Sequence, residues 1–248
     1  MAKFLSVVIP AYNEEKNLKK KVLDEVWNYL KNQKYSWEVL IVDDGSTDKT
    51  AELVADVIKK TRGNFKLLKE KHRGKGGTVV AGMLQAKGDY ALFTDMDQAT
   101  PISEIEKFLP KLGKYDIVIG SRSGREGAPI VRKLMAYGFM LLRTVILRLP
   151  YKDTQCGFKA FKIGSAGKIF KRLKVFSENN IISGASVSAG FDLEILYIAR
   201  KLGLKVAEVN VNWSHKDTER INPIRDSYEG LRDLFKVRVN AILGRYKV

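Results

Sequence analysis

Short apolar runs alternate with longer amphipathic stretches through the first half of the chain. The runs are rich in β-branched and aromatic residues, and they occupy residues 4–9, 37–44, 65–69, 90–95 and 115–122. Strands that alternate with helical patterns form right-handed βαβ units, so this pattern predicts an α/β fold with a mostly parallel sheet flanked by helices. The runs are almost continuously apolar, which is typical of strands buried on both faces.

After Gly120 the pattern changes to helices with isolated strands. We expect basic amphipathic helices over residues 130–149 and 224–243, strands over 157–161 and 206–213, and a helix over 191–203 that ends at Gly203. No linker rich in proline or glycine interrupts the chain, and no repeat is present. The sequence therefore predicts a single domain over residues 1–248, arranged as two lobes.

The charge of the chain predicts an anionic partner. Of 248 residues, 44 are Lys or Arg and 28 are Asp or Glu, which gives a net charge of +16. Such an excess suits nucleic acid, a membrane surface or a phosphorylated substrate. The alternative is a solubilising coat of charge with no partner. The hydrophobic fraction of 45% is sufficient for a core.

Cysteine and histidine usage excludes several classes of site. The single cysteine, Cys156, rules out an internal disulfide and a multi-cysteine zinc site, and it indicates a reducing compartment. The two histidines, His72 and His215, lie far apart in sequence, which argues against a histidine-rich metal centre. Cys156 has no base partner in the sequence pattern, so we interpret it as a packing residue.

The N-terminus lacks the layout of a signal peptide. No run approaches the ~18–20 apolar residues that span a bilayer. The nearest run, residues 134–150, is interrupted by Arg143 and Arg148. We therefore expect a cytoplasmic protein with no transmembrane segment.

Two pairs of aspartates follow predicted strands, at the sheet edge where ligands bind in α/β folds. Asp43 and Asp44 could accept hydrogen bonds from a ribose or a base, although turn and N-cap chemistry is the alternative for this stretch. Asp95 and Asp97 are separated by one residue. In extended backbone they would project to the same side and converge on one hard cation, Mg²⁺ or Mn²⁺, although loop capping is again the alternative.

Residues 72–77 place glycines and Lys75 at a predicted helix N-terminus, which is a natural anion site. The spacing is not that of a P-loop, and no dinucleotide-binding glycine pattern follows the first strand. ATPase and dehydrogenase functions are therefore disfavoured.

The segments "VVIPAYNEE", "EVLIVDDGSTD", "RGKGG" and "TDMD" occur in that order. Together they resemble the inverting family 2 glycosyltransferases with the nucleotide-sugar-binding GT-A fold. In the second half, "DTQCGFKAF" and "GFDLEILYIA" resemble the dolichyl-phosphate β-glucosyltransferases, and the related mannose synthases are similar. The resemblance implies a Rossmann-like GT-A sheet with a nucleotide-sugar-binding half, 1–120, and a C-terminal acceptor-binding lobe, 121–248.

The resemblance also implies roles for individual residues. The nucleoside site would be lined by Pro10, Ala11, Tyr12, Glu14, Asp43 and Asp44. The donor diphosphate would be bound by Asp95, Met96 and Lys75, with Asp95 and Asp97 as ligands of Mg²⁺ or Mn²⁺ and Asp97 also catalytic. Arg122 and Arg132 would hold the lipid phosphate as catalytic residues. Lys216 and Arg220 could close over the diphosphate. The mannose synthases resemble this pattern with a glutamine where this chain has Ala99, so the third metal ligand stays open between that position and Gln98.

The function that this resemblance implies is metal-dependent, inverting transfer of glucose from UDP-glucose to dolichyl or another polyprenyl phosphate, for glycan assembly. A lipid monophosphate is largely dianionic at neutral pH, so it needs no general base to attack. Basic helices at the cytoplasmic face of an anionic membrane would account for the positive charge. One alternative is a mannose synthase that uses GDP-mannose, and another is a non-catalytic nucleotide-sugar-binding module. The alternative of a different class is a basic nucleic-acid-binding protein, which the strand-end aspartates disfavour because they repel phosphates.

Overall fold

The computed structural model describes residues 4–61, 63–122, 130–175, 190–214 and 223–247, with residues 130–136 and 223–227 described by their backbone alone. The strands are β1 (Phe4–Ala11), β2 (Ser36–Asp43), β3 (Phe65–Lys69), β4 (Tyr90–Phe93), β5 (Ile117–Arg122), β6 (Lys159–Lys162) and β7 (Val206–Val211). The helices are α1 (Glu15–Lys19), α2 (Val22–Leu30), α3 (Thr50–Lys60), α4 (Gly74–Gln85), the 3₁₀ segment η1 (Ile102–Lys107), α5 (Leu109–Leu112), α6 (Ile130–Leu147), α7 (Ile163–Phe170), α8 (Gly190–Lys201) and α9 (Pro223–Ile242).

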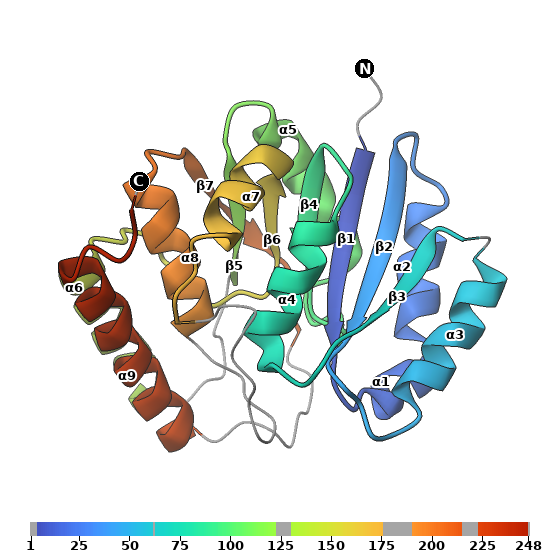
Figure 1. Ribbon diagram of the computed structural model, residues 1–248, viewed down its shortest axis with the longest axis horizontal. Helices are drawn as coiled ribbons and strands as arrows, with labels where there is room; N and C mark the ends of the chain where they lie inside the picture. Colours follow the sequence, from blue (N-terminus) through green and yellow to red (C-terminus); the bar gives the residue numbers. More distant parts are fainter. Residues whose placement is uncertain (1–3, 62, 123–129, 176–189, 215–222, 248) are drawn as a thin grey trace.

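The strands form one sheet in the order β3-β2-β1-β4-β6-β5-β7 (Figure 1). All neighbouring pairs are parallel except those of β6, which runs antiparallel to β4 and to β5. The expected mostly parallel sheet flanked by helices is therefore confirmed. The sequence pattern did not show that β6 inserts between β4 and β5, so both halves of the chain build the same sheet.

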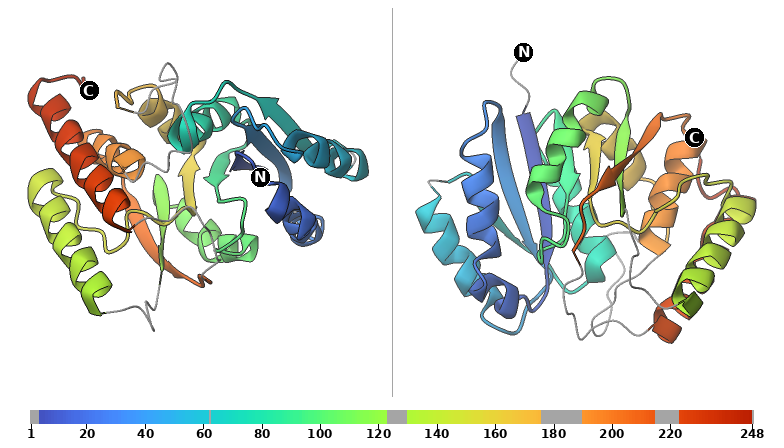
Figure 2. Two further views of the ribbon diagram at one scale, coloured as in Figure 1. Left: turned by 90° about the horizontal axis from the view of Figure 1, so that it is seen from below. Right: turned by 180° about the vertical axis from the view of Figure 1, so that it is seen from behind.

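Two apolar cores lie on opposite faces of this sheet, because successive strand residues point to opposite sides. In β1, Leu5, Val7 and Ile9 belong to the core under α2, η1 and α5, whereas Val8 belongs to the core under α4, α7 and α8. The views in Figure 2 show these two helical layers. In α4, a Cβ on Gly82 would overlap Val8, so glycine allows the helix to lie directly against the sheet.

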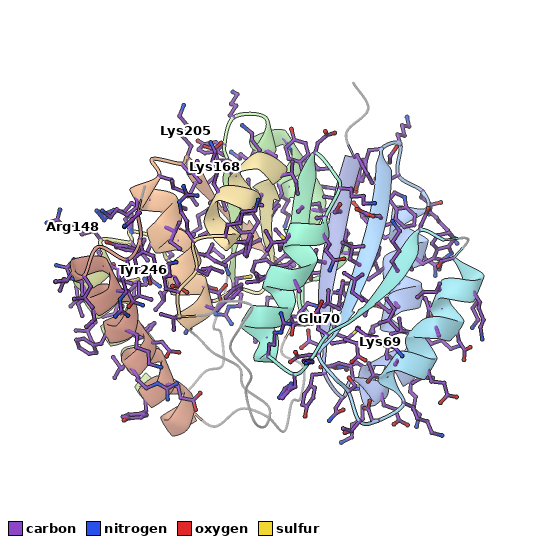
Figure 3. The ribbon with its side chains drawn as sticks, viewed as in Figure 1. Lys69, Glu70, Arg148, Lys168, Lys205 and Tyr246 are labelled. Atoms are coloured by element: carbon purple, nitrogen blue, oxygen red, sulfur yellow. The ribbon has the colours of Figure 1, made fainter. Side chains whose placement is uncertain are left out.

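Helices α6 and α9 lie side by side outside α8 and away from the sheet (Figure 2). The C-terminal end of the chain is tied to α8, since the Tyr246 hydroxyl donates to Glu194 at 2.7 Å (Figure 3). The expected helices over 130–149 and 224–243 are observed. α6 begins at the expected residue and ends two residues early, and both ends of α9 lie one residue earlier than expected. Among the described residues, no helix is both long and apolar enough to cross a bilayer.

The polarity of α6 differs from the amphipathic expectation. Arg143 is 2% exposed, while Leu141 and Val145 are 54% and 69% exposed. An arginine normally lies on the solvent side of a surface helix. Here it points inward because the following loop supplies two acceptors for its guanidinium, the Tyr151 carbonyl and the Thr154 hydroxyl.

Candidate active site

Six parallel strands, β1, β2, β3, β4, β5 and β7, end at the same edge of the sheet (Figure 1). β5 shares their direction because β6 is antiparallel to both of its neighbours. The loops that follow these strands carry most of the sequence-predicted site residues. Such an edge is the usual ligand site of α/β sheets.

The loop after β1 is fastened to the loop after β2. The backbone N–H of Asn13 donates to the Ser46 hydroxyl at 2.9 Å, and the Asn13 side chain accepts from the N–H of Thr47 at 2.8 Å. The N–H of Glu14 donates to Thr50 at 2.7 Å. Pro10 and Ala11 are the last residues of β1 and lie at the base of this loop pair. These contacts bring the predicted nucleoside-site residues of both loops together.

Asp43 and Asp44 are both buried, and both accept hydrogen bonds from the protein. Asp43 accepts from the N–H of Ser46 at 3.0 Å, which is the turn chemistry considered from sequence. Asp44 accepts from the N–H of Arg73 at 2.7 Å and is bonded to Nδ1 of His72 at 2.8 Å. Asp44 therefore holds the loop before α4 in place, in addition to any role toward a ligand.

Tyr12 stacks on His72 at this position. Their ring centroids are 4.2 Å apart and the rings are within 18° of parallel. The pair makes a flat aromatic wall beside Asp44, and such a wall suits a nucleobase. The sequence analysis named His72 only in arguing against a histidine-rich metal centre and missed this contact, because stacking partners 60 residues apart leave no local signal.

Asp95 lies two residues after the last residue of β4. Its carboxylate forms an ion pair with the Lys75 ammonium at 2.6 Å. Lys75 is in the first turn of α4, as predicted. Burial would lower the pKa of Lys75, but the carboxylates of Asp95, Asp192 and Asp97 outweigh it and raise that pKa. A Cβ on Gly157 would overlap the Asp95 carboxylate, so glycine at this position allows the carboxylate to lie where it does.

The residues after Asp95 form a turn, so the expectation of extended backbone through Asp97 is wrong. The N–H of Gln98 donates to the Asp95 carbonyl at 3.2 Å, and Gln98 has a φ of 50°. The Asp97 carboxylate accepts from the N–H of Ala99 at 2.9 Å. The strand ends earlier because these local bonds replace ladder bonds.

The side chains beside the two aspartates are turned into the protein. Gln98 donates from its amide to the Asp95 carbonyl at 2.8 Å, so it braces the turn. Ala99 is 7% exposed and offers no side-chain ligand. Met96 is 3% exposed and packs in the core under η1, so only its backbone could contact a donor.

The residues present fit a divalent cation. Asp95 and Asp97 supply hard carboxylate oxygens, and the Lys75 ammonium already shows that a cation is favoured against Asp95. Within the described ranges no cluster of three His, Cys, Asp or Glu side chains could enclose a metal. A pair of carboxylates suits Mg²⁺ or Mn²⁺, which complete their coordination with water and phosphate oxygens.

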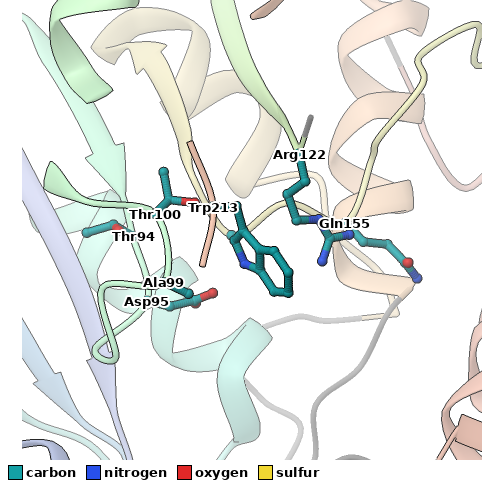
Figure 4. Close-up of a pocket in the computed structure, with 8 residues that line it drawn as sticks. Thr94, Asp95, Ala99, Thr100, Arg122, Gln155 and Trp213 are labelled. Carbon is teal, nitrogen blue, oxygen red and sulfur yellow. The ribbon is translucent and has the colours of Figure 1, made fainter. Parts of the chain in front are cut away.

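Arg122, at the end of β5, lines a small pocket with Asp95, Gln155 and Trp213 (Figure 4). The guanidinium donates two hydrogen bonds to the Asp153 carboxylate, from Nε to Oδ2 at 2.6 Å and from Nη2 to Oδ1 at 2.9 Å. The guanidinium also lies over the Trp213 ring, 5.7 Å from its centroid. Burial would lower the pKa of Arg122, but Asp153 outweighs this effect and raises it, so the guanidinium stays charged.

A second buried ion pair underlies the pocket. Lys159 is fully buried, donates to the Cys156 carbonyl and binds Asp192 at 2.6 Å. Asp192 lies in the first turn of α8. Burial raises the pKa of the Cys156 thiol, which fits the packing role predicted for it. The pair places another carboxylate near Lys75, that of Asp192, which lies in the segment "GFDLEILYIA" but received no role from the sequence.

The structure does not describe the side chains of three predicted residues. Lys216 and Arg220 lie outside the described residues, and Arg132 is described only by its backbone in the first turn of α6. The structure brings together Lys75, Asp95 and Arg122. It adds Asp153, which begins the segment "DTQCGFKAF" but received no role from the sequence, and Trp213. The packing of β5, β7 and the loop before β6 shows the contact of each with Arg122.

The family model described as glycosyl transferase family 2 matches residues 6–170. A dolichyl-phosphate β-glucosyltransferase from Dictyostelium discoideum is 38% identical, covering 99% of this chain and 77% of that protein. The protein of the same name from Saccharomyces cerevisiae is 33% identical, covering 98% and 77%. That from Homo sapiens is 33% identical, covering 99% and 78%.

Solved structures with the same fold include a glucosyl-3-phosphoglycerate synthase from Mycobacterium tuberculosis in complex with Mn²⁺, UDP and phosphoglyceric acid. Its TM-score is 0.64 at 19% identity, covering 95% of this chain and 78% of that one. Mannosyl-3-phosphoglycerate synthase from Rubrobacter xylanophilus has a TM-score of 0.63 at 17% identity, covering 99% and 76%. These similarities establish the GT-A fold.

Proposed function

Since the chain belongs to glycosyl transferase family 2, we propose that it transfers glucose from UDP-glucose to dolichyl or another polyprenyl phosphate, with inversion at the anomeric carbon. The names of relatives 33–38% identical over nearly the whole chain support this acceptor and this sugar. The observation that carries the proposal is the pocket in which Asp95 and Arg122 face one cavity. It pairs a carboxylate suited to a metal-bound diphosphate with a cation suited to an acceptor phosphate.

The donor would lie along the edge from β2 to β4. The Tyr12–His72 stack and the loops that hold Asp43 supply a flat wall and polar groups for a nucleoside. Lys75 would bind the diphosphate, because its ammonium lies at a helix N-terminus next to Asp95. The UDP complex of the Mycobacterium tuberculosis synthase, which shares the fold, supports a uridine donor.

Asp95 and Asp97 would hold Mg²⁺ or Mn²⁺. When bound, such an ion neutralises the charge that develops on the leaving nucleoside diphosphate. The chain contributes the ligands on a turn that Gln98 braces. Lys75 supplies further positive charge on the same side. Together these groups would stabilise the departing diphosphate.

The acceptor phosphate would be positioned by Arg122. The Arg122 guanidinium has five N–H donors. Two of them donate to the Asp153 carboxylate, so others remain for phosphate oxygens. A dianionic phosphate attacks without a general base. Arg132, in the first turn of α6, and Lys216 and Arg220 are further candidate phosphate-binding residues.

A lipid acceptor requires contact with a membrane, and the surface offers one. Every large hydrophobic side chain exposed in the described part of the chain lies on α6, on α9 or directly after it. We call this set the apolar α6–α9 face: Tyr137, Leu141, Leu142, Val145, Tyr228, Phe235, Val239, Ile242 and Leu243. Exposed basic residues adjoin it, among them Arg148, which points outward in Figure 3. An apolar face rimmed by cations suits an anionic bilayer, so the protein would act peripherally at a membrane surface.

The decisive experiment measures transfer of radiolabelled sugar into a lipid product. UDP-glucose is compared with GDP-mannose, and dolichyl phosphate with a soluble sugar acceptor, in Mg²⁺ or Mn²⁺ and again with EDTA. Transfer from UDP-glucose to the lipid phosphate that EDTA abolishes is expected. Transfer from GDP-mannose alone would reassign the donor, and no lipid product from either donor would overturn the proposal.

A further inference from the structure

Arg143 of α6 is buried, and no carboxylate of the described residues binds it directly. Its guanidinium donates to the Thr154 hydroxyl at 2.8 Å and to the Tyr151 carbonyl, both neutral acceptors. In the described structure its Nε atom has no hydrogen-bond partner. Burial lowers the pKa of Arg143, although Asp153 and Glu208 act against this. Burying a cation without a directly paired carboxylate costs free energy. A role for the contacts of Arg143 would explain why this cost is accepted.

These contacts hold the loop of residues 151–154 from one side, and Glu208 of β7 holds it from the other. The Glu208 carboxylate accepts from the N–H of Lys152 at 3.0 Å and from the N–H of Asp153 at 2.7 Å. Thr154 is fully buried. Asp153 is therefore fixed between bonds from α6 and bonds from the sheet.

The position of Asp153 in turn sets that of Arg122. Its carboxylate accepts from Nε and Nη2 of Arg122 and from the Arg122 backbone N–H at 3.2 Å. The guanidinium then lies against the Trp213 ring in the pocket. A guanidinium held at two points by one carboxylate has a defined plane and direction.

We propose that Arg143 is a positioning residue for the acceptor phosphate. Through Thr154 and Asp153 it orients Arg122, and it links that residue to the helix whose outer surface is part of the apolar α6–α9 face. The inference rests on the proposed function, since it assigns Arg122 to the acceptor. It accounts for a buried cation on the inner side of α6, next to the core residue Leu147, while the outer side carries Leu141, Leu142 and Val145.

The kinetic test compares Arg143→Met with Arg200→Met. Arg200 also binds α6, donating from α8 to the Leu147 carbonyl at 3.2 Å. In the described structure it acts on the 151–154 loop only through its charge near Tyr151, with no hydrogen bond to Tyr151, Asp153 or Thr154. Arg143→Met is expected to raise the KM for polyprenyl phosphate by about 3- to 30-fold, the usual range for a residue that acts through a packed network, with the KM for UDP-glucose unchanged. Arg200→Met is expected to change neither. An unchanged acceptor KM in Arg143→Met, or an equal rise in both KM values, would overturn the inference while leaving the proposed function intact.

A second measurement needs no activity. The chain has three tryptophans, so 5-fluorotryptophan labelling gives three ¹⁹F resonances, and Trp213→Phe identifies that of Trp213. Arg143→Met and Asp153→Asn are expected to shift or broaden the Trp213 resonance and leave the other two in place, whereas Arg200→Met leaves all three. A Trp213 resonance unmoved in Arg143→Met overturns the inference even if the protein proves to use another substrate. If Arg143→Met does not fold, Thr154→Val, which removes one of the two acceptors at nearly constant volume, carries the same expectations with smaller changes.

Discussion

At the scale of single residues, the site is a set of opposite charges at close range. Lys75 binds Asp95, Asp153 binds Arg122, and both pairs border one pocket. Each charge is held in a defined place, so little rearrangement is needed when a charged substrate enters. This preorganisation is how polar sites stabilise developing charge.

Asp97→Ala tests the predicted metal site. Loss of one carboxylate ligand is expected to weaken Mn²⁺ binding by at least about tenfold, because each ligand and its partners contribute that much to affinity. Mn²⁺ titration followed by electron paramagnetic resonance measures this directly. Asp56→Ala serves as the control, since that carboxylate is exposed on α3 and pairs with Lys59. Equal Mn²⁺ affinity in wild type and Asp97→Ala would show that the ion is held elsewhere.

Asp153→Asn tests the buried ion pair through the pH dependence of stability. Burial would raise the pKa of Asp153, but bonds from Arg122 lower it. A carboxyl with a depressed folded-state pKa stabilises the protein fully above its unfolded pKa, near ~3.9, and that contribution disappears as pH falls through the folded value.

At pH 7 the substitution is therefore expected to reduce the free energy of unfolding by about 3 kcal/mol, the usual cost of breaking a buried pair. The difference between the variants should shrink below about pH 4, where the unfolded carboxyl protonates. Urea unfolding at pH 7 and pH 3 measures both. A difference that stays constant between these pH values would exclude the ion pair as its source.

At the scale of elements, loops far apart in the chain depend on one another. The segment before β6 supplies both Asp153, which orients Arg122, and Gly157, against which Asp95 packs. A short segment thereby sets the positions of the residues assigned to donor and acceptor.

Gly157→Ala is expected to lower the rate of transfer by up to about 100-fold, since the new methyl would push the Asp95 carboxylate aside and a displacement near 1 Å can cost that much. Gly164→Ala in α7 is the matched control, because nothing lies within 4 Å of a Cβ there. The control should retain its rate and its thermal stability. Steady-state kinetics of both variants decide the point, and equal rates would mean that Asp95 adapts freely.

The apolar α6–α9 face is testable as an element. The double variant Val145→Ser, Ile242→Ser is expected to bind anionic vesicles about tenfold more weakly, because it removes two exposed apolar side chains, 69% exposed each, from the contact. Flotation with phosphatidylserine vesicles measures the change, with Lys59→Ser on α3 as the control. Vesicle binding equal to that of the wild type would contradict a membrane role for this face. If the variant instead loses dimerisation, the face would be assigned to a second copy of the chain.

At the scale of the whole molecule, the net charge of +16 acts with this face. Each basic residue close to an anionic bilayer contributes about 1 kcal/mol, and salt screens this attraction over about 8–10 Å at physiological ionic strength. The sum can hold a peripheral protein at a membrane without an inserted span.

Vesicle affinity is therefore expected to fall at least about tenfold, or ~1.4 kcal/mol, between 50 mM and about 500 mM salt. Co-sedimentation across this range tests it, with neutral phosphatidylcholine vesicles as the control that should bind weakly throughout. Binding to anionic vesicles that is insensitive to salt would attribute attachment to apolar contact alone.

The sequence by itself determined the features that depend on local pattern. Alternating apolar runs and helical stretches were sufficient for the α/β sheet, because strand and helix periodicities are properties of neighbouring residues. The strand-end rule was sufficient to single out Asp43 and Asp95 as candidates, because polar residues at the ends of buried strands must emerge at a sheet edge, whereas the role of Arg122 came from the family resemblance.

Only the tertiary structure decided how these residues combine. The insertion of β6 between β4 and β5 brings Gly157 to Asp95 and Asp153 to Arg122, and long-range pairing leaves no periodic signal in a sequence. The inward turn of Arg143 contradicts the usual polarity of a surface helix, since it depends on acceptors that the following loop supplies. Local chemistry therefore selected the residues, and packing between distant segments assigned their partners.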